Sequence, residues 1–169
     1  MSSFTDRMLG AAKLNVATFE EVESDTSATL QALAVVVLAS VAMGIGGMYF
    51  GGIGLIVRGI LGAVLGWAIW AGLIWLIGTK LLPEPQTRSD WGEIARTTGF
   101  AQAPGVLRIF GFVPLVGVVI TVVANIWMLV AMVIGVRQAL DYRDTWRAIA
   151  VVVIGWLVNM LIIFLLGRG

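Results

Sequence analysis

The sequence predicts an all-α membrane protein, a polytopic bundle of five transmembrane helices whose third span is short and broken. Long apolar runs carry this prediction, because a helix needs about 20 apolar residues to cross a hydrocarbon core of roughly 30 Å. Such runs occupy residues 30–82, 113–140 and 148–166. Composition agrees, since the chain is 59% hydrophobic with a mean hydropathy of +0.97, and its 12% of charged residues is about half the share of a soluble domain.

Composition also limits the chemistry that the chain can perform. It contains no cysteine and no histidine, which leaves no disulfide or thiolate site and removes both the commonest metal ligand and the usual near-neutral proton shuttle. No Ser–His or Cys–His pair can supply an activated nucleophile. We therefore expect a protein that is not an enzyme, with no catalytic residue, no cofactor and no metal.

The first 27 residues are predicted to form a cytoplasmic N-terminal tail, followed by a transmembrane domain over residues 28–169. Up to residue 29 the chain carries five acidic and two basic residues, a balance that disfavours nucleic acid as a partner. The tail lacks the basic start, short apolar core and small-residue cleavage site of a signal peptide, so we expect it to be retained.

Within the tail, apolar side chains recur at helical spacing between Ser3 and Asn15. Phe4, Met8 and Ala12 would share one helix face, and Ser3 can cap the amino-terminal end. This pattern favours a short amphipathic helix on the membrane surface, and a frayed tail is the alternative.

The first span is predicted over residues 28–50 and the second over residues 53–82, joined by a glycine-rich hairpin. Small residues on one face allow two membrane helices to approach closely, and amides within spans hydrogen-bond across helices. The residues expected to pack helices in these two ways are Gly44, Gly47, Gly51, Gly62, Gly66, Asn125 and Asn159. For the glycines, packing of the two spans within one chain and homodimerisation both remain open.

The third segment contains signals that start and stop helices. Prolines end the second span, and the polar loop after them leads to Asp90 and Glu93, which match a capping box. They would begin a short interfacial helix that ends near Gly99, and Pro104 would restart a helix. We interpret residues 94–112 as a broken third span. A re-entrant segment is the alternative, because broken backbone is tolerated at membrane depth only inside protein.

The fourth and fifth spans are predicted over residues 114–138 and 146–167. With five spans and a cytoplasmic N-terminus, the loops at residues 83–93 and 139–147 lie inside, and more basic residues surround them than surround the outer turns. The positive-inside rule therefore places the N-terminus in the cytoplasm and the C-terminus outside.

Several short motifs occur in an order that resembles the Ypt-interacting protein (YIP) family. The Gly99-Phe100-Ala101 triplet ahead of Pro104 is similar to the Gly-aromatic-small triplet that precedes a proline in that family. Other segments that match in order and spacing are residues 17–22, Val113-Pro114, Ile126-Trp127, residues 135–140 and Arg147-Ala148. The resemblance covers almost the whole chain.

The resemblance implies a five-helix membrane domain with a cytoplasmic N-terminus. Eukaryotic members of the family lie in early secretory membranes, bind prenylated Rab-type GTPases and one another, and act in vesicle trafficking. This chain lacks their long cytosolic region with an Asp-Leu-Tyr-Gly-Pro motif, and its Trp- and Gly-rich helices resemble a prokaryotic member. We therefore expect it in a bacterial plasma membrane.

Two sets of charged residues are candidate binding sites. The first lies on the cytoplasmic loops and helix ends, where carboxylates and guanidiniums either dock a protein partner or pair with one another and order the helix ends. Its members are Asp90, Glu93, Arg96, Arg137, Asp141, Arg143 and Arg147. The second lies at the outer helix ends without an acidic residue, and is expected to bind anionic lipid headgroups, with independent snorkelling as the alternative. Its members are Arg58, Arg108 and Arg168.

These observations favour a non-enzymatic integral membrane scaffold or adaptor of YIP type. Its expected partners are membrane lipids and a membrane or cytoplasmic protein, which includes a second copy of the chain. The alternatives are an accessory or assembly subunit of a larger membrane complex and a small channel or transporter. No predicted span carries an acidic residue near its centre, which disfavours ion-coupled transport.

Overall fold

The computed structural model describes residues 2–47 and 52–166, and every element of secondary structure in these two ranges is helical. In chain order the elements are α1 (Phe4–Ala12), α2 (Val16–Ser24), α3 (Ala28–Gly46), α4 (Gly52–Leu76), the π-helix η2 (Ile77–Leu81), α5 (Trp91–Phe100), the 3₁₀ helix η3 (Ala103–Phe112), α6 (Val116–Ala139) and α7 (Thr145–Leu166). Four of the described helices, α3, α4 with η2, α6 and α7, are long and apolar enough to cross a membrane.

The bounds of these four helices follow the predicted spans closely. The helix α3 ends at Gly46, where Gly47 forms the C-cap. The second span begins with α4 and widens into the π-helix η2 before it ends at Leu81, two residues ahead of Pro83. Because proline has no N–H to donate and clashes with the preceding turn, the helix cannot continue past this point.

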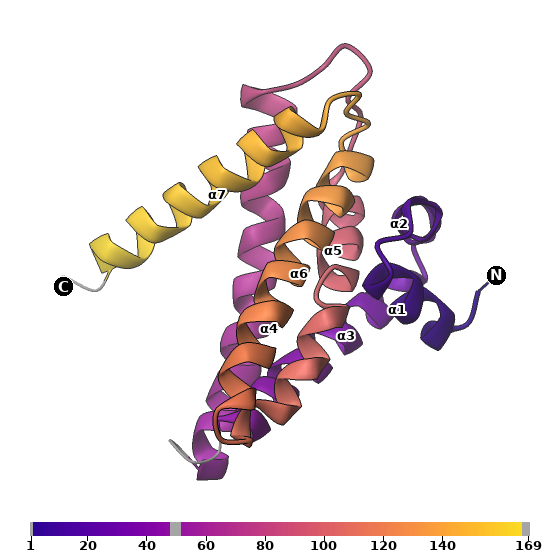
Figure 1. Ribbon diagram of the computed structural model, residues 1–169. Helices are drawn as coiled ribbons and strands as arrows, with labels where there is room; N and C mark the ends of the chain where they lie inside the picture. The colour runs from indigo at the N-terminus through magenta and orange to yellow at the C-terminus, as the bar shows by residue number, and fades with distance from the viewer. Residues whose placement is uncertain (1, 48–51, 167–169) are drawn as a thin grey trace.

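The third segment is broken, as predicted, into α5 and η3. The Asp90 side chain accepts the backbone N–H of Glu93, and the Glu93 carboxylate accepts the backbone N–H of Asp90, which confirms the capping box. In Figure 1 the two helices follow one another from the end of the bundle where the second span stops to the end where α6 begins. Ten α-helical and ten 3₁₀ residues together measure about 35 Å, enough to cross the hydrocarbon core. A fifth crossing remains a prediction.

The two halves of the third segment form the centre of the bundle. The helix α5 contacts α2, α3, α4 and α6, while η3 lies between α3 and α6. Residues 94–101 are all buried, so α5 does not lie at the interface as expected but inside the protein. Inside the protein the hydroxyl groups of Thr97 and Thr98 donate to carbonyls of the same helix, so they need no water.

Two glycines allow η3 to approach its neighbours closely. A Cβ atom on Gly46 of α3 would lie 2.0 Å from the carbonyl oxygen of Arg108, and one on Gly117 of α6 would lie 2.2 Å from that of Gly111. Since these contacts are with backbone, which cannot move aside cheaply, no larger residue fits at either position.

The tail forms two helices that pack on the bundle. Ser3 caps α1 in a capping box with Asp6, which confirms the predicted start of the first helix. The second helix, α2, was not predicted, and Asn15 caps it. The helix α2 packs on α5 and α6, and the Trp127 indole of α6 donates a hydrogen bond of 2.8 Å to the Ala12 carbonyl of α1. The tail is therefore part of the fold.

The last helix, α7, leans away from the others in Figure 1, and its far end and α1 lie on opposite sides of the molecule. Its first half packs on α4, η2 and α6 through small buried residues that include Ala148, Val151 and Gly155. Beyond Gly155 its described side chains are mostly exposed, including Trp156 and Leu157.

Candidate functional site

Two loops interlock at the end of the bundle where α4 and α6 stop. The first loop follows the second span, and its Glu84 forms an ion pair with Arg147, with 3.1 Å between Oε1 and Nε. The other carboxylate oxygen of Glu84 accepts the backbone N–H of Arg143 at 3.3 Å. Gln86 donates to the backbone carbonyl of Asp141 at 3.0 Å. The Glu84 side chain is only 9% exposed, so this carboxylate joins the two loops from within.

Tyr142 ties the same loops to the end of the second span. Its hydroxyl lies 3.0 Å from the Gly78 carbonyl and 2.7 Å from the Leu82 carbonyl, so its one proton is shared between acceptors that the π-helix leaves free. Burial raises the pKa of Tyr142 to about 12, and the hydroxyl therefore stays a donor throughout the physiological pH range.

Arg7 holds the two tail helices together. Its guanidinium is 2% exposed and lies 2.9 Å from Glu21 and 2.6 Å from Asp25, and it also donates to Gln31 of α3. Hydrogen bonds to Ser27, followed by those to Arg7, lower the pKa of Asp25 to about 2. One cation thus joins α1, α2 and the start of the first span.

Arg96 fastens α2 to the centre of the bundle. It is 5% exposed, and its Nε lies 3.0 Å from the carbonyls of Val22 and Glu23, while an Nη atom makes a further short contact with the Glu23 carbonyl. These are carbonyls that the end of a helix leaves without an intrahelical donor. A cation at a helix C-terminus is also favoured by the helix dipole.

Glu23 lies beside this contact among other carboxylates. Burial, followed by the negative charges of Glu93 and Asp141, raises its pKa to about 7, and the nearby Arg96 opposes this rise. Glu23 therefore changes charge close to neutral pH at the junction of α2, α5 and the loop after α6.

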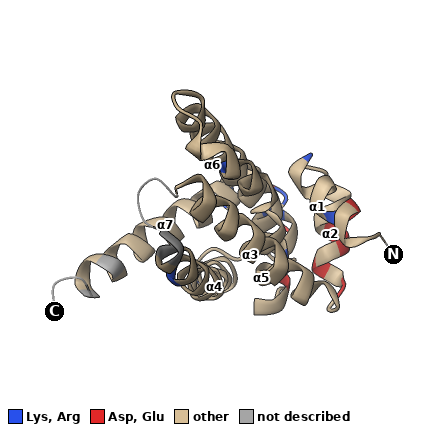
Figure 2. Cartoon of the chain, turned by 90° about the horizontal axis from the view of Figure 1, so that it is seen from below, with Lys and Arg blue, Asp and Glu red and all other residues tan. Residues whose placement is uncertain are grey.

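We use the term polar face for α1, α2 and the loops of residues 82–90 and 140–144. All acidic residues of the chain belong to it except Glu93 and Asp25, which directly follows α2. Figure 2 shows acidic positions gathered on α1 and α2, whereas the sequence of α7 contains no charged residue after Arg147. The charged residues exposed on or beside the two loops are Arg88, Asp90, Asp141, Arg143, Asp144 and Arg147.

The predicted partner-docking residues separate into two groups in the structure. Asp90, Asp141, Arg143 and Arg147 are exposed on or beside the polar face. Arg137 is half-buried and donates to the carbonyls of Tyr142 and Arg143, while Glu93 is half-buried at the start of α5. Arg96 leaves the docking set, because the packing of α2 covers its guanidinium. Some of these charges therefore order the loops and others are exposed, and docking of a partner by the exposed ones stays a prediction.

The predicted lipid-headgroup residues do not come together. Arg58 is exposed on α4 without a hydrogen bond or ion pair among the described residues. Arg108 is half-buried and lines a cavity between α3, η3 and α6 to which Arg58 does not contribute. Arg168 lies outside the described residues.

The predicted helix-packing residues also behave differently from one another. A Cβ on Gly44 would lie 2.8 Å from Ile56, so this glycine does pack α3 on α4. A Cβ atom on Gly62 or Gly66 would have no neighbouring atom within 4 Å. One on Gly47 would contact only backbone carbonyls of the end of its own helix. The Gly62 and Gly66 face is therefore not the contact between the first two spans, because α4 turns other residues toward α3.

The remaining packing candidates make no contact of the expected kind within the described chain. Asn125 is exposed and Asn159 half-buried, and neither side chain has a hydrogen bond among the described residues. Gly51 lies outside the described residues.

Several residues that organise the polar face were missed from the sequence. They are Arg7, Glu21, Asp25, Glu84 and Tyr142. A signal existed for Arg7, because a single arginine precedes a run of acidic residues at helical spacing. For Glu84 and Tyr142 no local pattern indicates that loops 55 or more residues apart in the chain meet.

Comparison with known proteins adds one positive finding. A family model described as the Yip1 domain matches residues 15–167, which includes α2 and all the predicted spans. No curated protein and no solved structure matches the chain.

Proposed function

The chain belongs to the Yip1 domain family, and from this premise we propose that it is a non-enzymatic integral membrane scaffold that binds a protein partner through its polar face. The observation that carries the proposal is the interlocking of segments distant in sequence into one surface. The segments that form this surface are joined by internal ion pairs and hydrogen bonds of Arg7, Arg96, Glu84 and Tyr142. Surfaces that are ordered before binding lose less conformational entropy when a partner arrives.

The side chains available to a partner are those that the internal network does not use. Arg88 and Arg143 are exposed, and their guanidiniums have no hydrogen bond or ion pair among the described residues. Trp146, three residues after Arg143, is 74% exposed at the start of α7. Arginine and tryptophan are the residue types that contribute most to binding energy at interfaces, so this patch is the centre of the proposed docking surface.

We place the protein in a bacterial plasma membrane with the N-terminus in the cytoplasm and the C-terminus outside. The concentration of Arg residues near the two loops supports this orientation by the positive-inside rule. The Trp- and Gly-rich helices support a prokaryotic origin.

Affinity purification after gentle detergent extraction, followed by mass spectrometry, tests the docking proposal. The wild-type chain should retain a protein at a fixed stoichiometry, and the double variant Arg88→Glu with Arg143→Glu should lose it. Arg58→Gln is the matched control, because this exposed arginine lies at the other end of α4. Retention of the same protein by the double variant, or co-elution of lipid alone with the wild type, would overturn the proposal.

A further inference from the structure

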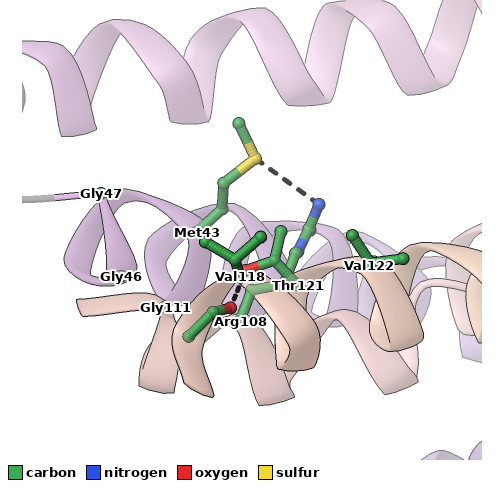
Figure 3. A pocket seen from close by; sticks show the side chains of 9 residues that line it. Met43, Gly46, Gly47, Arg108, Gly111, Val118, Thr121 and Val122 are labelled. Atoms are coloured by element: carbon green, nitrogen blue, oxygen red, sulfur yellow. Dashed lines mark hydrogen bonds between the residues drawn. The ribbon is translucent and has the colours of Figure 1, made fainter. Parts of the chain in front are cut away.

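A cavity opens at the end of the bundle opposite the polar face. Its volume is about 350 Å³, and it lies between the last turn of α3, η3 and the first turns of α6 (Figure 3). Its lining is apolar or small except for Arg108 and Thr121. The Thr121 hydroxyl donates to the Gly117 carbonyl at 2.8 Å, so Arg108 is the one charged group that faces this space among the described residues.

The guanidinium of Arg108 is held in place by backbone. Its Nε donates to the Gly105 carbonyl at 3.1 Å and one Nη donates to the Ala39 carbonyl at 3.2 Å. The other Nη contacts the Met43 sulfur at 3.5 Å, drawn as a dashed line in Figure 3. A guanidinium has five N–H donors and thioether sulfur is a weak acceptor. At least two N–H groups are therefore left for another oxygen acceptor.

No carboxylate within the described chain balances this positive charge. Residues 26–83 and 94–140, which include α3, α4, η3 and α6, contain neither Asp nor Glu. Arg108 makes no ion pair among the described residues. An arginine within the apolar part of a membrane protein needs an anion, water or backbone carbonyls, and here carbonyls use only part of its donors.

The cavity lies near one end of a helix that is long enough to span a membrane, on the side where lipid headgroups would meet the bundle. The α6 residues that line it, from Gly117 to Val122, lie within the first seven residues of a helix long enough to span, or about 10 Å from its end. The exposed Val118 and Val122 continue from the cavity onto the apolar surface of α6. A bound headgroup could thus leave its acyl chains on the surface that faces the bilayer.

We propose that this cavity binds the phosphate of an anionic phospholipid, with Arg108 as the phosphate ligand. An anionic headgroup is favoured over a zwitterionic one because the lining supplies no carboxylate for a choline or ethanolamine cation. The two backbone hydrogen bonds distinguish Arg108 from a snorkelling residue, since they hold the guanidinium between α3 and η3. Arg58, at the same end of the bundle but exposed on α4, makes no such contacts.

Native mass spectrometry of the purified full chain in detergent tests this proposal with phosphatidylglycerol and phosphatidylcholine as probes. The wild type should retain one phosphatidylglycerol in preference to phosphatidylcholine. Arg108→Gln should weaken that retention about fivefold or more, the equivalent of roughly 1 kcal/mol for one arginine at an anionic lipid. Arg58→Gln should retain phosphatidylglycerol as the wild type does.

A second variant separates loss of the site from loss of the fold. Val122→Trp fills the cavity from its exposed rim without removing the guanidinium, and should also lose the bound lipid. Equal retention by wild type, Arg108→Gln and Val122→Trp would overturn the proposal, as would equal loss in Arg58→Gln and Arg108→Gln. Displacement of phosphatidylglycerol by excess inorganic phosphate would overturn the assignment to lipid in favour of a free anion.

Discussion

Two arginine side chains hold the amino-terminal helices on the bundle, and each uses a different kind of acceptor. Arg7 pairs with the carboxylates of Glu21 and Asp25 within the tail. Arg96 reaches from α5 to the backbone carbonyls of Val22 and Glu23. Both guanidiniums are buried, so removal of either leaves acceptors without a donor inside the protein, which costs more than the bond itself contributes.

Replacement of Arg96 by Gln should loosen α2 from the bundle while the membrane helices stay folded. The lost charge-assisted hydrogen bonds are worth about 2 kcal/mol, which corresponds to an increase of roughly 30-fold in the open population of the tail. Phe19 of α2 is fully buried, so chymotrypsin cleavage at this residue reports on opening. The cleavage rate should rise by a similar factor.

Arg143→Gln is the control for this measurement, because Arg143 is exposed and its guanidinium has no partner among the described residues. It should be cleaved at the wild-type rate. Unchanged protection of Phe19 in Arg96→Gln would show that the hydrogen bonds to α2 do not hold the tail.

Glu23 gives the junction of the tail a dependence on pH. Its pKa is raised in the folded chain from 4.5 to about 7 by burial and by the charges of Glu93, Asp141 and Glu20, against the influence of Arg96. The folded state thus binds this proton more tightly than the unfolded state does. The resulting stabilisation is complete below about pH 4.5 and is lost as the pH rises through about 7.

Replacement of Glu23 by Gln should therefore raise the melting temperature at pH 7.5 and above. Thermal unfolding in detergent, followed by tryptophan fluorescence at several values between pH 5 and 8, measures this effect. The difference between variant and wild type should grow with pH across this window. A difference that is constant with pH would contradict the assignment of the titration to Glu23.

At the scale of the elements, tryptophan indole N–H groups fix which helices are neighbours, which the hydropathy of the helices does not indicate. Trp67 of α4 donates to the Ala95 carbonyl of α5 at 3.0 Å, and Trp91 of α5 returns a bond to the Ala68 carbonyl of α4 at 3.1 Å. The two rings lie 6.4 Å apart. This reciprocal arrangement fixes the position of α5 along α4 through both ring packing and hydrogen bonds.

Glycines set how closely the elements approach, and their effects depend on which face they occupy. Gly117→Ala should destabilise the protein by about 2 kcal/mol, in the range of overpacked cores, because its Cβ would lie 2.2 Å from the Gly111 carbonyl oxygen. Gly62→Ala should be neutral or stabilising by up to about 1 kcal/mol, because alanine favours the helix and nothing lies within 4 Å.

Melting temperatures of the two variants in the same detergent measure this contrast. Gly117→Ala should melt several degrees lower than the wild type, and Gly62→Ala at the same temperature or higher. Equal destabilisation by both would mean that the Gly62 face is packed, which would point to a contact outside the single chain.

At the scale of the whole molecule, the path of the third segment decides which side of the membrane each loop occupies. The helices α5 and η3 lead from one end of the bundle to the other (Figure 1). Arg88 precedes α5 and Leu115 follows η3 in the chain, so the two residues flank opposite ends of this segment. A re-entrant segment would bring both to the same end. The charge distribution predicts which end lies in the cytoplasm, because more basic residues lie at the end that carries the loop of residue 88.

Single-cysteine labelling with a membrane-impermeant maleimide tests this path in intact cells. The chain has no native cysteine, so Arg88→Cys and Leu115→Cys each introduce one reactive thiol at an exposed position. Leu115→Cys should react from outside, and Arg88→Cys only after the cells are permeabilised. Reaction of both from the same side would exclude a crossing by the third segment.

Local features of the sequence were enough to predict much of the fold. Continuous apolar runs predicted the four long helices, and the proline after residue 82 predicted where the second span ends. The Asp90 and Glu93 pair predicted the start of α5, and Pro104 its separation from η3. Each depends on neighbouring residues alone, because caps, proline and helix length act within a few turns.

The site could be predicted only in part. The exposed loop charges, such as Asp141 and Arg143, follow from their positions between spans. The burial of Arg96 does not, because it depends on α2, whose Val22 carbonyl lies 74 residues away in the chain and whose docking no local pattern indicates. The docking set from sequence therefore included a residue that the fold uses internally.

The sequence by itself determined that this is a helical membrane protein, where its four long helices begin and end, and how its charges divide between the two ends. Only the tertiary structure decided which helix faces meet, which glycines are in contact, and which arginines are buried. The physical reason is that membrane helices are apolar on every side, so their periodicity gives no sign of a buried face. Close packing of backbones selects that face instead, as at Gly46 and Gly117.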